Sequence, residues 1–179
     1  MEAVVELITA FKQNPSELTE TVEEALNSPE IFEILFSIIG SEVGEDIKSY
    51  AIVFIGRAFE AQIQSIDEAV LSSIKEHLQV IVFSQQLTGD LLSKAIGTTE
   101  KILEKVGFEN WSELFRHCLE AAQAAETIAI ALKMLTSIIQ FTPDEVIQEN
   151  AEYIVAASNA GTHSDSWEQR ANGFALFST

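Results

Sequence analysis

The chain has 179 residues, 47% of them hydrophobic, and its 28 acidic and 10 basic residues give a formal net charge of −18. This apolar content is sufficient for a continuous core, so a disordered chain is not expected. The negative charge repels nucleic-acid phosphates and anionic lipids and suits basic protein partners, although it would equally serve to keep an apolar array in solution. We therefore expect no binding to nucleic acid.

Cysteine content and apolar run lengths bear on the compartment. Cys118 is the only cysteine, so no intrachain disulfide can form, which favours a reducing compartment. The N-terminal segment carries Glu2 and no basic region, unlike a signal peptide. The longest apolar runs, at 51–55 and 128–132, are far shorter than the roughly 20 residues that span a bilayer. We expect a soluble, intracellular protein without membrane insertion.

Hydrophobic spacing predicts helices along the whole chain. In residues 2–13 apolar side chains recur at intervals of three and four, which places them on one face of a helix. No useful period-two alternation appears, so no sheet is expected. The pattern predicts ten helices, or five antiparallel pairs with short connections, over residues 2–13, 15–27, 29–40, 44–61, 65–85, 88–106, 110–122, 124–140, 143–158 and 165–177.

Proline, capping and glycine signals mark the ends of these helices. All three prolines, Pro15, Pro29 and Pro143, fall at predicted helix starts, where the missing amide hydrogen costs nothing. Capping-box spacings begin at four polar residues, which we expect to cap the helices that follow them: Asn14, Ser65, Asn110 and Thr142. Glycines are expected at or close to helix ends at positions 40, 44, 89, 107 and 161.

An alanine set among large apolar residues recurs along the chain, at Ala51, Ala95, Ala131 and Ala171, at intervals of roughly 40 residues. Irregular self-similarity of this length is typical of a solenoid of helical pairs, in which each pair buries its apolar face against the next. In the helix around Ala51, we expect an apolar packing face that includes Val53, Phe54 and Ala58. The last residues, ANGFALFST, lack the polar face of a terminal repeat, so we expect the chain to be the N-terminal part of a longer protein.

No pattern indicates catalysis, a cofactor or a metal. His117 and Cys118 are adjacent on a predicted helix and so point about 100° apart, which prevents a thiolate and a base from meeting. His77 and His163 have no further ligands at metal spacing, and phosphate-loop motifs are absent. Trp111 and Trp167 each open a predicted helix and are expected to pack between repeats. We expect a protein that is not an enzyme.

The order of several motifs resembles the N-terminal region of the importin-β (karyopherin-β) family of nuclear transport receptors. The motifs are EEAL at residues 23–26 before Pro29, an apolar helix over 31–39, a helix that runs from Lys48 through Ala51 to Arg57, and the W-x-x-L motif within residues 108–114. The resemblance covers essentially the whole chain. It implies one domain over residues 1–179, folded as a right-handed α-solenoid of about five HEAT repeats.

The resemblance also implies partners and a location. Members of this family bind the GTP form of the small GTPase Ran, carry protein cargo and pass nuclear pores by contacts with Phe-Gly nucleoporins, so they occur in the cytoplasm, the nucleus and the nuclear envelope. Ran lies against the second helices of the first repeats, which correspond here to residues 15–27, 44–61 and 88–106. The candidate Ran-binding residues are Glu20, Glu24, Asp46, Lys48, Arg57, Lys94 and Lys101.

Two alternatives remain open at the level of sequence. For each candidate residue the competing interpretation is an ordinary solvated helix charge, since isolated surface charges are common and individually contribute little. For the whole chain, the competing function is a HEAT-repeat scaffold or regulatory subunit that does not bind Ran. An enzyme would need convergent polar groups, which the sequence does not offer.

Overall fold

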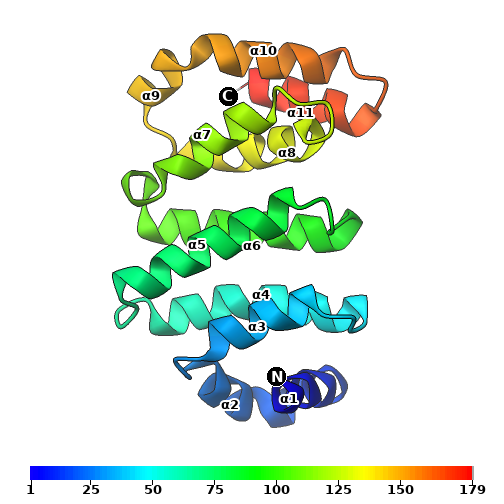
Figure 1. The fold of residues 1–179 in the computed structure, drawn as a ribbon, viewed down its shortest axis with the longest axis vertical. Coiled ribbons are helices and arrows are strands. Elements are labelled where there is room, and N and C mark those ends of the chain that lie inside the picture. Colours follow the sequence, from blue (N-terminus) through cyan, green and yellow to red (C-terminus); the bar gives the residue numbers. More distant parts are fainter. Residues whose placement is uncertain (179) are drawn as a thin grey trace. The chain divides into compact units, whose positions relative to one another are not determined.

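A computed structural model describes residues 1–178. Within them the chain forms eleven α-helices, two short 3₁₀ helices and no β-strand, which confirms the predicted all-α class (Figure 1). The helices belong to two compact units, one made of residues 1–78 and 87–99 and the other of residues 79–86 and 100 onward.

The first unit contains four complete helices and parts of two more. The complete helices are α1 (Glu2–Gln13), α2 (Pro15–Leu26), α3 (Ile31–Gly40) and α4 (Glu45–Gln62). Two further helices, α5 (Glu68–Phe83) and α6 (Gly89–Val106), contribute residues to both units.

The second unit contains the remaining helices. They are the 3₁₀ helix η1 (Phe108–Asn110), α7 (Ser112–Ala121), α8 (Ile128–Ile138), the 3₁₀ helix η2 (Ile139–Phe141), α9 (Asp144–Glu149), α10 (Ala151–Thr162) and α11 (Trp167–Phe177).

The helix predicted over residues 143–158 is wrong in one respect, because it is interrupted at Asn150. The Asn150 side-chain amide donates a hydrogen bond to the Val146 carbonyl at 2.9 Å, and its backbone leaves helical geometry, with φ −109° and ψ 12°. A short polar side chain that bonds to nearby backbone competes with the helical ladder. The chain therefore forms α9 and α10 as separate helices, and α10 continues beyond the predicted end, to Thr162.

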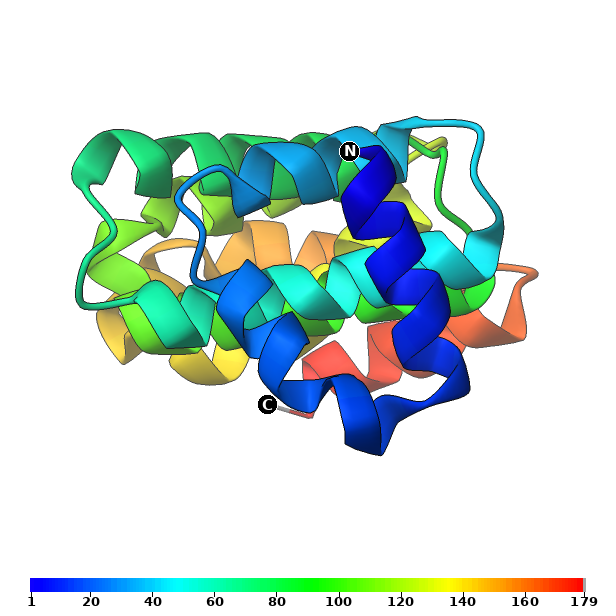
Figure 2. The same cartoon turned by 90° about the horizontal axis from the view of Figure 1, so that it is seen from below.

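Helix α4 is the centre of the first unit. Ala51 and Ile55 are fully buried, α3 packs along α4, and α1 runs across it (Figure 2). Phe11 of α1 meets Phe54 of α4 edge-on, with ring centroids 5.6 Å apart, an arrangement that aromatic pairs favour. The predicted packing face of α4 is wrong at Val53, which is 41% exposed.

Contacts within the first unit join α3 to α5 and α4 to α6. The Phe36 ring of α3 stacks on the His77 ring of α5 at 4.8 Å. The Thr98 hydroxyl of α6 donates to the Ile52 carbonyl of α4 at 3.2 Å, and both residues are buried. The first helices of the second and third pairs thus contact each other, and so do their second helices.

The second unit repeats this arrangement. His117 of α7 meets Phe83 of α5 edge-on at 4.6 Å. Lys133 of α8 pairs with Glu168 of α11 at 3.2 Å. Helices α10 and α11 approach closely, and the buried Ser158 hydroxyl donates to the Gly173 carbonyl at 2.6 Å.

The polar residues expected to cap helices mostly bond elsewhere. Ser65, Asn110 and Thr142 donate their side-chain hydrogen bonds to carbonyls of the preceding turns, those of Gln62, Val106 and Ile138. Asn14 stands at the N-cap of α2 without a side-chain capping bond. The α5 start is capped instead by Asp67, whose carboxylate accepts from the Val70 amide at 2.8 Å.

The three prolines differ in how well they fit the prediction. Pro15 lies in the first turn of α2, as predicted, because its fixed φ suits that position. Pro143 immediately precedes α9. Pro29 lies in the turn before α3, two residues ahead of the first helical residue, so the predicted start at that position is wrong.

The recurrent small and aromatic residues are only partly confirmed as packing residues. Ala51, Ala95 and Ala131 are completely buried, whereas Ala171 is exposed. Trp111 is buried, as expected. Trp167 is 74% exposed, so the expectation that it packs between repeats is wrong.

Candidate protein-binding surface

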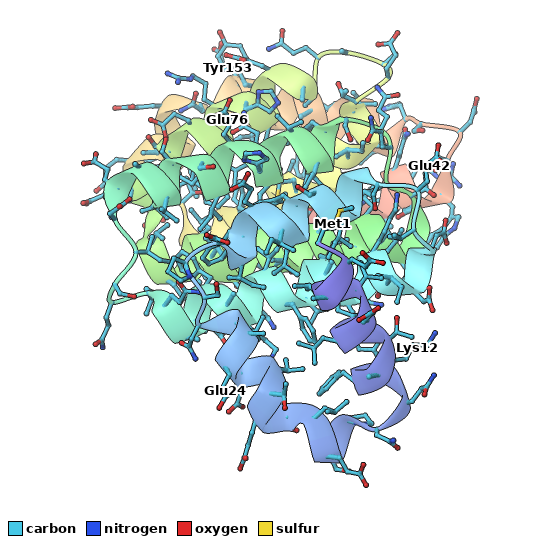
Figure 3. All side chains as sticks on the ribbon, turned by 60° about the horizontal axis from the view of Figure 1, so that its bottom comes forward. Met1, Lys12, Glu24, Glu42, Glu76 and Tyr153 are labelled. Atoms are coloured by element: carbon cyan, nitrogen blue, oxygen red, sulfur yellow. The ribbon has the colours of Figure 1, made fainter. Side chains whose placement is uncertain are left out.

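The exposed face of α2 carries two of the candidate residues. Val22 and Leu26 are buried and fix the inward face of α2, which turns Glu20 and Glu24 outward, one helical turn apart. Glu24 extends from α2 into solvent (Figure 3). These two carboxylates are accessible to a basic partner.

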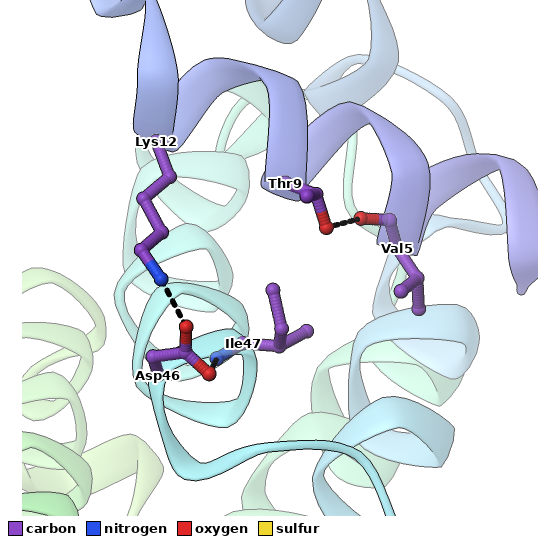
Figure 4. Close-up of polar contacts among 5 residues, drawn as sticks. All are labelled: Val5, Thr9, Lys12, Asp46 and Ile47. Carbon is purple, nitrogen blue, oxygen red and sulfur yellow. Dashed lines mark hydrogen bonds and ion pairs between the residues drawn. The ribbon is translucent and has the colours of Figure 1, made fainter.

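Asp46, in the first turn of α4, is held by two contacts. Its carboxylate pairs with the Lys12 ammonium of α1 and accepts a hydrogen bond from the Ile47 amide at 3.0 Å (Figure 4). The hydrogen bond between the two side chains lowers the pKa of Asp46 and raises the pKa of Lys12, because it favours both charged forms. Asp46 therefore links α4 to α1 and remains a half-exposed charge.

Arg57, three turns further along α4, also has a partner within the first unit. Its guanidinium lies 3.7 Å from the Glu23 carboxylate of α2 and 5.6 Å from the centroid of the Phe54 ring. The cation–π contact and the ion pair orient the guanidinium between α2 and the aromatic core. A binding partner of Arg57 would have to share it with Glu23.

The two candidate lysines of α6 differ in their setting. Lys94 donates to the Asp90 carboxylate and to the Ser49 hydroxyl of α4, both at 2.6 Å. Lys101 is exposed but belongs to the second unit, so the structure does not place it with the others. Lys48 is half-buried on α4.

A groove between α2 and α4 was not foreseen from the sequence. It has a volume of about 360 Å³, and it is lined by Glu23, Leu26, Asn27, Arg57, Glu60 and Ala61. The Gln62 amide of α4 donates to the Ser28 carbonyl at 3.2 Å and to the Leu26 carbonyl, which ties α4 to the end of α2 beside the groove. The sequence signal was the spacing of three and four residues that sets Glu23 beside Glu20 and Glu60 beside Arg57.

The remaining chemistry-bearing residues are placed apart from this surface. Cys118 is fully buried, and burial raises the pKa of its thiol, which keeps it protonated at neutral pH. Within residues 1–178 no three or more His, Cys, Asp or Glu side chains gather in a way that could hold a metal ion. In the same part of the chain, no helix is both long enough and apolar enough to cross a membrane.

Comparison with known proteins does not identify a function for the chain, so any functional proposal depends on the observations above. No family model, no curated protein and no solved structure matches the chain.

Proposed function

We propose that the protein is an importin-β-like nuclear transport receptor of the cytoplasm and nucleus, folded as a right-handed solenoid of about five HEAT repeats. In this proposal its N-terminal helical pairs bind Ran in its GTP form, and the array carries protein cargo past the Phe-Gly nucleoporins of the nuclear pore. The proposal rests on the order of the family-like motifs, on the repeat spacing and on the exposed polar face of α2 and α4.

The main observation that supports a repeat is the sequence separation of residues joined by side-chain hydrogen bonds. Five of the side-chain hydrogen bonds between different helical pairs join residues 45, 46, 40, 35 and 36 positions apart, close to the spacing of the recurrent alanines. Within each unit they join second helices of successive pairs. Stacking of similar helical pairs on their sequence neighbours is what a solenoid requires.

The polar face supports a protein partner with exposed basic residues. Glu20 and Glu24 extend from α2 beside Glu23 and the groove that Arg57 and Glu60 line. Carboxylates arranged in this way attract a basic patch and raise its association rate. Asp46 and Lys94 have intramolecular partners and contribute to the position of α4, so we expect a smaller direct role for them.

The test is binding of the purified chain to Ran loaded with a non-hydrolysable GTP analogue or with GDP, measured by pull-down and by biolayer interferometry. We expect binding to the GTP form that is at least about tenfold stronger than binding to the GDP form. The double variant Glu20→Lys/Glu24→Lys should weaken binding to the GTP form, mainly through the association rate.

The matched control is Glu2→Lys/Glu6→Lys, which makes the same charge change at the same spacing on the exposed face of α1. It should leave binding nearly unchanged. A folded chain that binds neither form, or both equally, would overturn the transport proposal and favour the HEAT scaffold. Equal loss in both double variants would show that only net charge matters and that α2 is not the contact surface.

A further inference from the structure

A second groove lies in the unit formed by residues 79–86 and 100–178. It has a volume of about 540 Å³ and opens between the turn that joins α7 to α8 and one face of α10. Six alanines line it, three from the turn side and three from α10: Ala122, Ala124, Ala125, Ala156, Ala157 and Ala160.

The groove exists because small side chains meet where larger ones would close the gap. Tyr153, Ala156, Ala157 and Ala160 follow the spacing that places them on one face of α10. The facing turn is held in shape by Thr127, whose hydroxyl donates to the Ala121 carbonyl at 2.7 Å. The groove is therefore formed before any partner arrives, which reduces the entropic cost of binding.

The groove has an apolar floor and an accessible rim. Ala122 and Ala157 are buried at its base, whereas Ala124, Ala156 and Ala160 are exposed. Tyr153, at 56% exposure, stands on the rim and offers a ring and a hydroxyl to an incoming chain. Tyrosines in this position are common anchors of protein interfaces.

The charge around the groove is negative. Glu120 and Glu126 flank the turn side, and Glu149 and Glu152 flank the start of α10; all four are exposed. The sequence has no lysine or arginine between Lys133 and Arg170, although six acidic residues occur there. An apolar groove inside a negative field is complementary to an apolar side chain flanked by cations.

We propose that this groove binds an amphipathic helix of a partner protein that carries lysine or arginine beside its apolar stripe. A bulky apolar side chain of the helix enters between the alanines, and the flanking cations face the four glutamates. Helix-in-groove recognition uses such small-to-large complementarity, with apolar anchors at intervals of three and four residues. This surface is formed by the second unit alone and does not depend on the proposed binding of Ran.

The test uses the full chain and three fluorescein-labelled peptides of about 18 residues, measured by fluorescence anisotropy. The first peptide has leucine and phenylalanine at helical spacing with lysine and arginine elsewhere. The second has the same composition in scrambled order, and the third carries Phe-Gly repeats without charge. We expect the first to bind at least about tenfold more tightly than the other two, and to weaken as salt is raised.

Two variants on α10 locate the site. Ala156→Arg places a bulky cation inside the groove and should reduce affinity for the first peptide by about tenfold or more. Val155→Arg introduces the same charge one residue earlier, outside the groove lining, and should leave the affinity within about twofold. Circular dichroism checks that both variants keep the helical content of the unaltered chain.

Three results would overturn the proposal. They are equal affinity for the ordered and scrambled basic peptides, preferential binding of the Phe-Gly peptide, and equal weakening by Ala156→Arg and Val155→Arg. None of them would affect the Ran proposal, because that proposal is tested on α2.

Discussion

Replacing Gly173 by alanine tests how closely α10 and α11 approach. A methyl carbon added to Gly173 would lie 2.7 Å from the Thr162 nitrogen, 2.8 Å from the Ser158 oxygen and 2.9 Å from the Gly161 carbonyl carbon. All three are backbone atoms of α10, so no side-chain rotation can relieve the contact. Since ordinary contacts between such atoms lie near 3.5 Å, we expect the helices to separate by roughly 1 Å.

The expected loss of stability combines three effects. Overpacking of a close helix contact costs about 1–3 kcal/mol. Separation also lengthens the 2.6 Å hydrogen bond from the buried Ser158 hydroxyl to the Gly173 carbonyl, at a cost of about 1 kcal/mol. Alanine gains about 1 kcal/mol over glycine in a helix interior, which offsets part of this. The net expectation is a decrease of about 1–3 kcal/mol in the free energy of unfolding.

Gly97 provides the matched control, because it lies inside α6 and a methyl carbon added there meets no atom within 4 Å. Gly97→Ala should therefore raise the free energy of unfolding by up to about 1 kcal/mol. Both variants are measured by urea unfolding, followed by circular dichroism and by tryptophan fluorescence, which should change because the buried Trp111 becomes exposed. If Gly173→Ala were as stabilising as Gly97→Ala, the close approach of the two helices would be refuted.

Two further predictions concern residues that the structure buries. Ala51→Leu should lower the free energy of unfolding by about 1–3 kcal/mol, because Ala51 is fully buried in α4. Ala171→Leu, at an exposed position, should leave the melting temperature unchanged. Equal melting temperatures for the two variants would contradict this prediction. Cys118 should not react with a maleimide in the folded chain at pH 8, because the thiol is buried and its pKa is raised. It should react fully when guanidinium unfolds the chain. Rapid labelling of the folded chain would contradict the burial of Cys118.

The helices were predictable because burial imposes a period on the sequence. Ile8, Val22 and Ala58 are completely buried, and each lies on a helix face that the spacing of apolar residues predicted. The break at Asn150 was not predictable in this way. Nothing in the apolar period distinguishes an asparagine that faces solvent from one whose amide bonds to the Val146 carbonyl, and that local bond decided the outcome.

Capping residues were harder to assign for a related reason. A serine or asparagine in a short connection can accept a hydrogen bond from the helix that follows or donate one to the helix that precedes. Ser65 and Asn110 donate to the preceding turn. The sequence contains both options, and the path of the chain between the two helices selects one.

The candidate binding surface was predictable as charges on one helix face, but not as a groove whose charged residues pair with one another. The spacing of Glu20 and Glu24 places them together on any helix. The pairing of Arg57 with Glu23 depends on how α2 lies against α4, and the groove beside them depends on the same packing. Contacts between helices that are distant in sequence cannot be read from the period of either helix alone.

The contacts of Arg57 with Glu23 and Phe54 affect how a binding partner could contact α4. Arg57 and Glu23 are partly exposed and 3.7 Å apart, and ion pairs of this kind contribute about 0–1 kcal/mol. A basic partner side chain can therefore take Glu23 away from Arg57 at little cost, while the contact of Arg57 with the Phe54 ring keeps the guanidinium in place. Because Phe54 is itself buried against α1, the position of that guanidinium depends on the packing of the first three helical partners of α4. The surface that we propose for Ran is thus a property of the packed N-terminal unit, and α2 and α4 as isolated peptides should not reproduce it.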